Sequence, residues 1–414
     1  MSGEATIVEH VTCLGCGCAC DDIAITVRDG RIAESRNACA LGASWFGDGA
    51  VPADARIGGA AAPRDAALDA AAAILRRARR ALVYLAPDIS VETQRAAVGL
   101  ADHLHAVVDD AGAAAVAPAI LAGQRRGRVV ATLGELRNRA DLVVFWGVDP
   151  AERYPRFTQR VALGGEGLFV GGARTIVAVD VGDAVAAPDA AARFAVGAGD
   201  ELDALAVLRA RLAGRPVGDT PLVPRLDALA ERLRTARYAA IVYDAEPAAR
   251  GAAAAASSAR AESLIALAQT LSAVTRCALC ALRAGGNRTG AELVLAWQTG
   301  YPMRVDFSRG APRYRPDDDA LSLLRSARVD AFLAVGDVRN APALGAGTAR
   351  RVVIGPRASL ADPTADVAID SAVAGIHEGG TAYRMDEIPL PLRASLAGPP
   401  AAAGLVAALA ERLA

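Results

Sequence analysis

Short apolar runs alternate with helical segments over most of this 414-residue chain, and this alternation narrows the choice of fold more than any other feature. The run 81–85 reads Ala-Leu-Val-Tyr-Leu, which is typical of a strand buried on both faces. Helical patterns precede it at 65–80 and follow it at 91–104. Further strands are expected at 106–109, 129–132, 142–146, 175–179, 193–196, 239–243, 277–282, 331–335, 352–354 and 367–369. Strands that alternate with helices predict parallel, doubly wound sheets in an α/β protein.

The length of the chain suits two or three domains. We expect an N-terminal module over 1–50, a first α/β domain over 51–220 and a second over 221–414. A local sequence similarity links the two larger parts, since 139–150 and 328–339 share one pattern. Each has a polar beginning, a buried strand, a glycine turn and then an acidic residue.

The glycine turns of these two similar segments contain Gly147 and Gly336. Ligands of open α/β sheets bind at the carboxyl ends of strands, where such turns lie. The pair therefore indicates two pseudo-equivalent, nucleotide-like pockets. The alternative is that each glycine only ends its strand, because a single glycine turn is weak evidence for a site.

Five of the seven cysteines lie within the first 39 residues. Three of them follow a C-x2-C-x3-C spacing, and a predicted hairpin over 23–34 returns the chain so that a fourth lies beside them. Four thiolates suit an iron–sulfur cluster or a tetrahedral zinc ion. The candidate ligands are Cys13, Cys16, Cys20 and Cys39. Cys18 is the fifth, and its side chain need not face the others.

The spacing leaves the metal open. Three cysteines on a compact loop with a distant fourth favour a 4Fe–4S cluster, whereas zinc, an empty relict site and structural thiols are the alternatives. Disulfides are not indicated, because no apolar signal segment precedes Cys13. Cys277 and Cys280 lie on one predicted strand and face opposite sides, which favours buried packing over redox or metal use.

The composition excludes several classes of function. The net charge is −1, which indicates neither a nucleic-acid nor an anionic-membrane partner. All 45 basic residues are arginine, so chemistry that needs a lysine amine is excluded. The sequence has no uncharged apolar run of about 18 residues, and we expect a soluble, cytoplasmic protein.

One unusual string, 297–314, reads Trp-Gln-Thr-Gly-Tyr-Pro-Met-Arg-Val-Asp-Phe-Ser-Arg-Gly-Ala-Pro-Arg-Tyr. Together with 134–141, 146–147, 380–386 and 389–393, it resembles the signature of the B subunit of formylmethanofuran dehydrogenase. The matching motifs begin at the first cysteines and cover nearly the whole chain. The resemblance implies the core of the molybdopterin oxidoreductases: a four-cysteine β module and two Rossmann-like, doubly wound halves, without the C-terminal barrel. In that family another subunit supplies the barrel.

The resemblance also implies roles for residues, where they persist. The four clustered cysteines match the cluster ligands of the family, and Arg283 matches an arginine of its active-site cleft. The family places a Cys or selenocysteine and a His on a loop after an early strand, to hold tungsten or molybdenum. The corresponding stretch here, 109–118, contains no Cys, His or Ser. Asp109 or Asp110 is the remaining candidate, as a hard oxygen ligand.

The pterin pocket departs from the family as well. The usual Gly-x-Asn-Pro turn reads Gly147-Val148-Asp149-Pro150 here. An ionised Asp cannot donate a hydrogen bond to a pyrophosphate, and it repels the anion. We therefore expect no bound molybdopterin. The expected degenerate pterin cleft lies near Gly147, Asp149, Arg283 and Gly336.

These departures predict a retained fold without a redox centre. The chain is most similar to the B subunit of the formyltransferase/hydrolase complex of methylotrophs, which acts in tetrahydromethanopterin-dependent one-carbon metabolism, from formaldehyde to formate. The resemblance implies a non-catalytic structural subunit with formyltransferase, amidohydrolase-like and other subunits as partners. The alternatives are an active molybdenum- or tungsten-pterin subunit and a small electron-transfer protein that uses only the N-terminal cluster.

Arginines are dense between Arg304 and Arg315, with tyrosine and phenylalanine between them. They suit the binding of carboxylates, either of a carrier or of a partner subunit. The alternative is a salt-bridged loop packed on the core, which this density of charge also favours.

Overall fold

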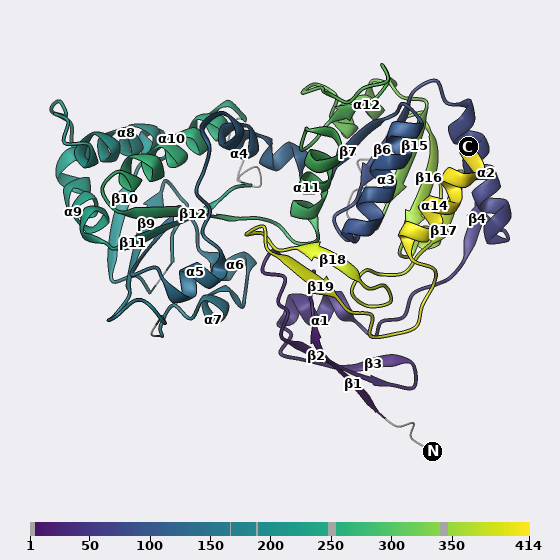
Figure 1. The fold of residues 1–414 in the computed structure, drawn as a ribbon, viewed down its shortest axis with the longest axis horizontal. Helices are drawn as coiled ribbons and strands as arrows, with labels where there is room; N and C mark the ends of the chain where they lie inside the picture. Colours follow the sequence, from purple (N-terminus) through teal and green to yellow (C-terminus); the bar gives the residue numbers. More distant parts are fainter. Residues whose placement is uncertain (1–4, 166, 188, 247–253, 340–346) are drawn as a thin grey trace. The chain divides into compact units, whose positions relative to one another are not determined.

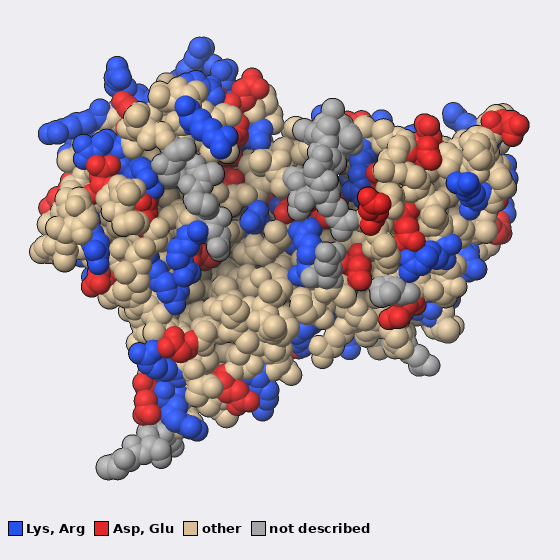
Figure 2. Space-filling view, turned by 180° about the vertical axis from the view of Figure 1, so that it is seen from behind, with Lys and Arg blue, Asp and Glu red and all other residues tan. Residues whose placement is uncertain are grey.

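The computed structural model describes residues 5–165, 167–187, 189–246, 254–339 and 347–414 (Figure 1). It is an α/β protein with several sheets, as the alternation of strands and helices predicts. Among the described residues, no helix combines the length and the apolar character that a bilayer crossing requires. Acidic and basic side chains are interspersed over the face shown in Figure 2, in keeping with a net charge of −1.

Contacts within the chain divide it into two compact units. Unit 1 contains Met1–Ala114 and Gly285–Ala414, and unit 2 contains Ala115–Ala284. The expected domain boundary at residue 220 differs from this division, because it falls inside unit 2. Strands from both sides of residue 220 pair in parallel there, at Val144 with Ile241, so one sheet spans the expected boundary.

Unit 2 is built on a five-stranded sheet in which each neighbouring pair is parallel. Its spatial order is β10 (Ala192–Val196), β9 (Thr175–Val181), β8 (Leu142–Trp146), β11 (Tyr238–Asp244) and β12 (Arg276–Leu282). Figure 1 shows α8 (Glu201–Leu212), α9 (Leu222–Thr235) and α10 (Ala254–Ser272) on one face, and α5 (Leu133–Asn138), α6 (Pro150–Arg153) and α7 (Phe157–Val161) on the other. Strands covered on both faces explain the uninterrupted apolar runs of the sequence.

Unit 1 contains a nine-stranded sheet with a parallel centre and antiparallel edges. The parallel centre consists of β7 (Val107–Asp110), β6 (Ala81–Leu85), β15 (Ala331–Val335), β16 (Arg350–Gly355) and β17 (Val367–Asp370). The edges are β13 (Val305–Asp306) with β14 (Arg313–Tyr314) and β4 (Ala55–Ile57) with β5 (Ala60–Ala61). Strands from before and after unit 2 in the sequence therefore form one sheet.

Two apolar cores cover the two faces of the nine-stranded sheet. Val83 of β6 belongs to the core under one set of helices, and its neighbour Leu82 belongs to the core on the other face, as alternation along a strand requires. The first core is completed by α2 (Arg64–Arg77), α3 (Val91–His103), α11 (Arg288–Thr299) and α14 (Ala402–Leu413). The second is completed by α12 (Ala320–Arg325) and α13 (Ala358–Ala361).

Two smaller sheets complete unit 1. The first consists of β1 (Thr6–Val11), β2 (Ile23–Arg28) and β3 (Arg31–Arg36), which pair antiparallel in that order and lead into α1 (Ala40–Phe46). The second pairs β18 (Gly380–Tyr383) with β19 (Pro389–Leu392).

The expected strand at 129–132 does not form. It follows α4 (Ala113–Arg126) and makes only one isolated bridge, between Val130 and Leu279. Thr132 instead caps α5: its hydroxyl accepts from the Glu135 amide, and the Glu135 carboxylate accepts from the Thr132 amide. The helix start therefore uses the backbone groups that a longer strand would need.

Candidate functional site

The cysteine-rich loop lies between β1 and β2 and is closed by its own backbone. The Cys13 N–H donates to the Cys20 carbonyl at 2.8 Å, and the Ala19 N–H donates to the Cys16 carbonyl at 3.1 Å. Strand β3 then returns antiparallel to β2, and Cys39 takes the N-cap position of α1. The predicted hairpin thus forms and brings the late cysteine back toward the first three.

The thiol of Cys13 is buried, and the other three candidate ligands affect its pKa. Burial raises the pKa of the Cys13 thiol to about 12; the Gly15 amide opposes this shift, and the charges of Cys16, Cys20 and Cys39 add to it. A Cβ at Gly42 of α1 would lie 3.3 Å from the Cys13 sulfur and 4.0 Å from the Cys39 sulfur, so glycine leaves room for both.

The thiols fit a metal in kind and number, but not in their arrangement. Within the part of the chain that the structure describes, no three His, Cys, Asp or Glu side chains are grouped as metal ligands. The cofactor is therefore not established. Cys18, the fifth cysteine of this region, is buried as well.

A cavity of about 700 Å³ lies in unit 1, beside the cysteine-rich loop. Gly15 of that loop and Trp45 of α1 form part of its wall, and much of the rest comes from the turns that follow β6, β15 and β16 of the large sheet. The charged side chains that line it are Asp88, Arg288, Asp337, Arg339 and Arg357. The cavity thus occupies the carboxyl edge of a parallel sheet, where α/β proteins bind ligands.

Gly336 is required by packing at this edge. Its φ is +108°, and a Cβ would lie 2.6 Å from the Ala86 side chain. The backbone oxygen of Gly336 would in turn lie 2.1 Å from a Cβ at Gly355. The turns after β6, β15 and β16 therefore pack so closely that two glycines are needed, which explains Gly336 without a ligand.

Two carboxylates and an arginine form a cluster in the cavity wall that the sequence did not predict. The Asp337 N–H donates to Asp88 Oδ1 at 2.9 Å, and Arg339 Nε donates to Asp337 Oδ2 at 2.8 Å. Burial, followed by the charge of Asp337, raises the pKa of Asp88 to about 6. The available signal was Asp88 itself, an acid just after the buried run 81–85.

The other three residues of the expected pterin cleft, Gly147, Asp149 and Arg283, belong to unit 2, whereas Gly336 belongs to unit 1. Gly147 has a φ of +59°, and its amide donates to the Val179 carbonyl. Asp149 caps α6, since its Oδ1 accepts from the Ala151 amide at 2.9 Å. Arg283 is buried with Glu246, and Nε lies 3.4 Å from Oε1.

The acidic pair at the end of β7 is held by backbone amides. Asp109 Oδ2 accepts from the Ala320 amide at 2.8 Å, and Asp110 Oδ1 accepts from the Gly112 amide at 2.7 Å. Burial raises the pKa of Asp109, whereas the Ala320 amide and the Arg304 guanidinium lower it. Asp109 Oδ1 has no hydrogen-bond partner among the described residues.

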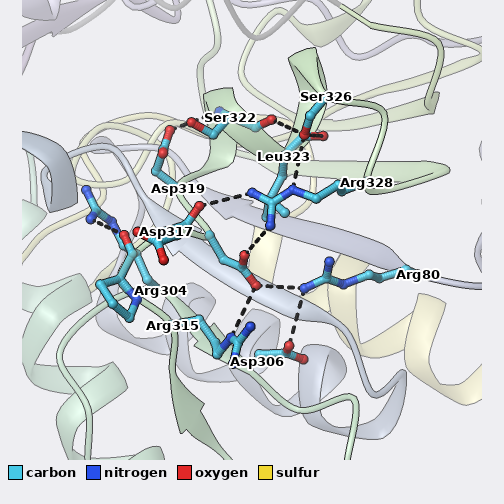
Figure 3. Close-up of polar contacts among 12 residues, drawn as sticks. Arg80, Arg304, Asp306, Arg315, Asp317, Asp319, Ser322, Leu323, Ser326 and Arg328 are labelled. Atoms are coloured by element: carbon cyan, nitrogen blue, oxygen red, sulfur yellow. Dashed lines mark hydrogen bonds and ion pairs between the residues drawn. The ribbon is translucent and has the colours of Figure 1, made fainter.

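One end of the arginine-rich segment lies beside the buried carboxylate of Asp318. Figure 3 shows Arg304 and Arg315 of this segment together with Arg80 and Arg328. Asp318 is 1 % exposed and receives Arg80 and Arg328, each at 2.7 Å. Arg315 approaches it to 3.9 Å, and Arg304 donates to the Pro316 carbonyl. These residues therefore form a salt-bridged loop, the second of the two readings that the sequence left open.

No protein-family model matches the chain. It is 30 % identical over 411 residues to the B subunit of the tungsten-containing formylmethanofuran dehydrogenase 2 of Methanocaldococcus jannaschii, a match that covers 94 % of this chain and 93 % of that protein. It is 30 % identical over 258 residues to the B subunit of the formyltransferase/hydrolase complex Fhc of Methylorubrum extorquens, covering 62 % and 67 %. Among solved structures, it resembles a chain of the formyltransferase/hydrolase complex of Methylorubrum extorquens in complex with methylofuran, with a TM-score of 0.75 and 26 % identity over 87 % of this chain and 98 % of that one.

Proposed function

This chain belongs to the family of formylmethanofuran dehydrogenase B subunits, and from that premise we propose that it is a non-catalytic structural subunit of a formyltransferase/hydrolase complex. Such a complex acts in tetrahydromethanopterin-dependent one-carbon metabolism, between formaldehyde and formate. Its partners are a formyltransferase subunit, an amidohydrolase-like subunit and further subunits. We place the complex in the cytoplasm, where its thiols stay reduced.

One observation carries the proposal: the segment after β7 offers no soft ligand for a heavy metal. Residues 109–118 contain no Cys or His, although the family uses such residues there. The two aspartates of this segment already accept hydrogen bonds from the amides of Ala320 and Gly112. Asp110 thereby stabilises the turn that follows it, and Asp109 holds the first residue of α12.

The pterin-binding turn supports the same proposal. Asp149 uses its carboxylate to cap α6, so a negative charge lies where the family has an amide that can donate a hydrogen bond. Like charges about 4 Å apart oppose each other by roughly 4 kcal/mol at an effective dielectric of about 20. Arg283, the matched cleft arginine, is paired with Glu246. We therefore propose that unit 2 retains a Rossmann-like half without its pterin.

For the N-terminal module we propose a metal bound by Cys13, Cys16, Cys20 and Cys39, as a 4Fe–4S cluster or as zinc. The support is the C-x2-C-x3-C spacing with its late fourth cysteine and the space that Gly42 leaves beside the sulfurs of Cys13 and Cys39, although the four side chains are not grouped as ligands in the described structure. Metal analysis of anaerobically purified protein tests this proposal. Cys16→Ser should abolish the bound metal, and Cys280→Ser, which alters a cysteine on β12, should leave it unchanged.

The full-length match to a tungsten-containing subunit favours a second candidate, an active tungsten- or molybdenum-pterin subunit. The two candidates differ in what the purified complex contains and does. We expect formyl transfer to a furan-type carrier, without tungsten, molybdenum or pterin in stoichiometric amount. Stoichiometric tungsten or molybdenum with a pterin, or dye-linked oxidation of a formyl carrier, would overturn the structural role and establish the alternative.

A further inference from the structure

Unit 1 exposes aromatic side chains at the end of α11 and just beyond it. Trp297, in the last turn of α11, is 55 % exposed, and Tyr301, just beyond that helix, is 38 % exposed. Trp and Tyr carry large apolar surfaces, and they are enriched among the residues that dominate binding at protein interfaces. Two exposed aromatics within five residues of chain therefore need an explanation.

The aromatic side chains are held in place by well-defined contacts. The Trp297 ring packs edge-on against Tyr383 at 5.7 Å, and the Tyr301 ring stacks on Tyr314 at 6.4 Å with 22° between the planes. The Tyr301 amide donates to the Thr299 hydroxyl at 3.1 Å, just after α11 ends at Gly300. Rings held in this way lose little entropy when a partner binds.

Two arginines of the same hairpin are free, in contrast to their neighbours. Arg309 lies on the turn between β13 and β14, and Arg313 lies on β14; both are exposed and form no ion pair with any residue that the structure describes. Arg304 and Arg315 of the same segment are engaged, with Pro316 and Asp318. The salt-bridged loop thus fixes the hairpin and leaves two cations for an external partner.

Strand β14 is also the open edge of the nine-stranded sheet. The Arg315 amide donates across the ladder to the Arg304 carbonyl at 2.9 Å. Hydrogen-bonding direction alternates along an antiparallel strand, so Tyr314 turns its own N–H and C=O to the open side. Tyr314 and Arg313 project to opposite faces of that edge, with the stacked tyrosines on one face and the free cation on the other.

We propose that β14 and the side chains around it, Trp297, Tyr301, Arg309, Arg313 and Tyr314, form the docking surface for another subunit of the complex. That subunit adds an extended segment along β14, with apolar side chains against the tyrosines and carboxylates against the arginines. None of the cavities described in unit 1 includes these residues, which favours a protein surface over a small ligand. The inference rests on the proposed function, since it requires a multi-subunit complex.

Hydrogen exchange tests the docking surface directly. The isolated chain and the assembled complex are compared by mass spectrometry on peptides that span 297–315. We expect the Tyr314 amide to exchange fast in the isolated chain and at least tenfold more slowly in the complex. The peptides of α13 serve as a reference within unit 1. Unchanged exchange at Tyr314 in an assembled complex would overturn the proposal.

Substitutions provide the second test. The double variant Arg309→Glu, Arg313→Glu should weaken assembly with the partner subunits about tenfold or more, because it places carboxylates against carboxylates. Tyr301→Ala should weaken it through the lost stack. The matched control is Arg28→Glu, Arg77→Glu, which reverses two other exposed arginines of unit 1 that form no ion pair with described residues. Circular dichroism and the melting temperature establish that each variant is folded.

The outcomes separate this inference from the proposed function. If the wild-type chain fails to assemble with formyltransferase and amidohydrolase-like subunits, the proposed function is wrong and the docking surface falls with it. If the wild type assembles, and the charge-reversed variant assembles equally well while folded, the docking surface alone is wrong. Loss of assembly in the charge-reversed variant but not in the control supports both.

Discussion

The carboxylate of Asp318 pairs with arginines from different parts of the chain. It is buried, and it accepts from Arg80 and Arg328 while Arg315 lies nearby (Figure 3). Asp318→Ala should lower the free energy of unfolding by about 3 kcal/mol, because it leaves cations without their buried counter-ion. Denaturant titration followed by tryptophan fluorescence measures the loss. The control is Asp227→Ala, which removes an exposed pair with Arg211 and should cost less than about 1 kcal/mol.

Asp88 should make stability depend on pH. Its pKa is raised to about 6 by burial and by the charge of Asp337, so the folded state binds a proton that the unfolded state has released. The stability that Asp88 contributes is complete below its ordinary pKa of 3.8 and is lost as the pH rises through about 6. Asp88→Asn keeps the acceptor for the Asp337 amide, and it should flatten the melting temperature between about pH 4 and pH 7.

Asp330 provides the control for this pH dependence. Burial alone would raise its pKa, but hydrogen bonds from the amides of Arg80 and Arg79 outweigh burial and lower the pKa. The stability from Asp330 is therefore present above its ordinary pKa and is lost only as the pH falls below it. Asp330→Asn should lower the melting temperature by a constant amount over the same window. An equal slope for Asp88→Asn and the wild type would contradict the assignment to Asp88.

At the residue scale, the sequence predicted a hairpin that returns Cys39 toward the first cysteines, but it did not predict the cavity cluster. Cys13 and Cys39 share a short segment whose hairpin is local, so the pattern alone brings them together. Asp88 and Asp337 are 249 positions apart in the sequence, and only the parallel pairing of β6 with β15 makes them neighbours. A pairing between distant strands leaves no local signal.

Gly286 joins two turns of unit 1 closely. Its φ is +80°, and a Cβ would lie 2.2 Å from the Pro87 oxygen, while its amide donates to the Leu14 carbonyl of the cysteine-rich loop. Gly286→Ala should cost about 3 kcal/mol or more, as left-handed strain and a backbone clash add. Gly214→Ala is the matched control: φ is +65° with open space around it, and the expected cost is about 1 kcal/mol. Equal melting temperatures for the two variants would count against the clash.

The elements themselves follow from pattern where they are long and local. The run 81–85 matches β6, and 142–146 matches β8, because both are buried on two faces. The two-residue strands β13 and β14 carry no period of their own, so the sequence did not predict them. Their pairing, of β13 with β7 and of β14 with β13, joins segments that are distant in the sequence or too short to show a pattern.

For the whole molecule, the two units differ in how they use the chain. Unit 2 is one continuous stretch whose five parallel strands all lie within it, whereas the large sheet of unit 1 joins strands from both sides of that stretch. Residues 115–284 expressed alone should therefore fold cooperatively, and residues 1–114 alone should not, because β6 then lacks β15. Circular dichroism with thermal unfolding measures both. A cooperative transition in 1–114, or none in 115–284, would contradict this division.

The sequence predicted α/β architecture and parallel sheets, but it misplaced the boundary between the parts. A pattern of strands and helices predicts the number of strands in the sheets, but it does not predict which strands pair. The similarity between 139–150 and 328–339 suggested two consecutive halves, yet the sheet that contains β15 also contains β6 and β7, which precede β8 in the sequence.

The insertion of unit 2 between the two sequence segments of unit 1 has a consequence for synthesis on the ribosome. Strands β6 and β7 leave the exit tunnel long before β15, β16 and β17 have been translated, while the whole of unit 2 emerges in between. The inserted unit can complete its folding first. Until then the hydrogen-bonding edge of β6 that later pairs with β15 stays unpaired. A nascent chain of this kind is a natural client for chaperones that cover such strands until residues 331–370 arrive.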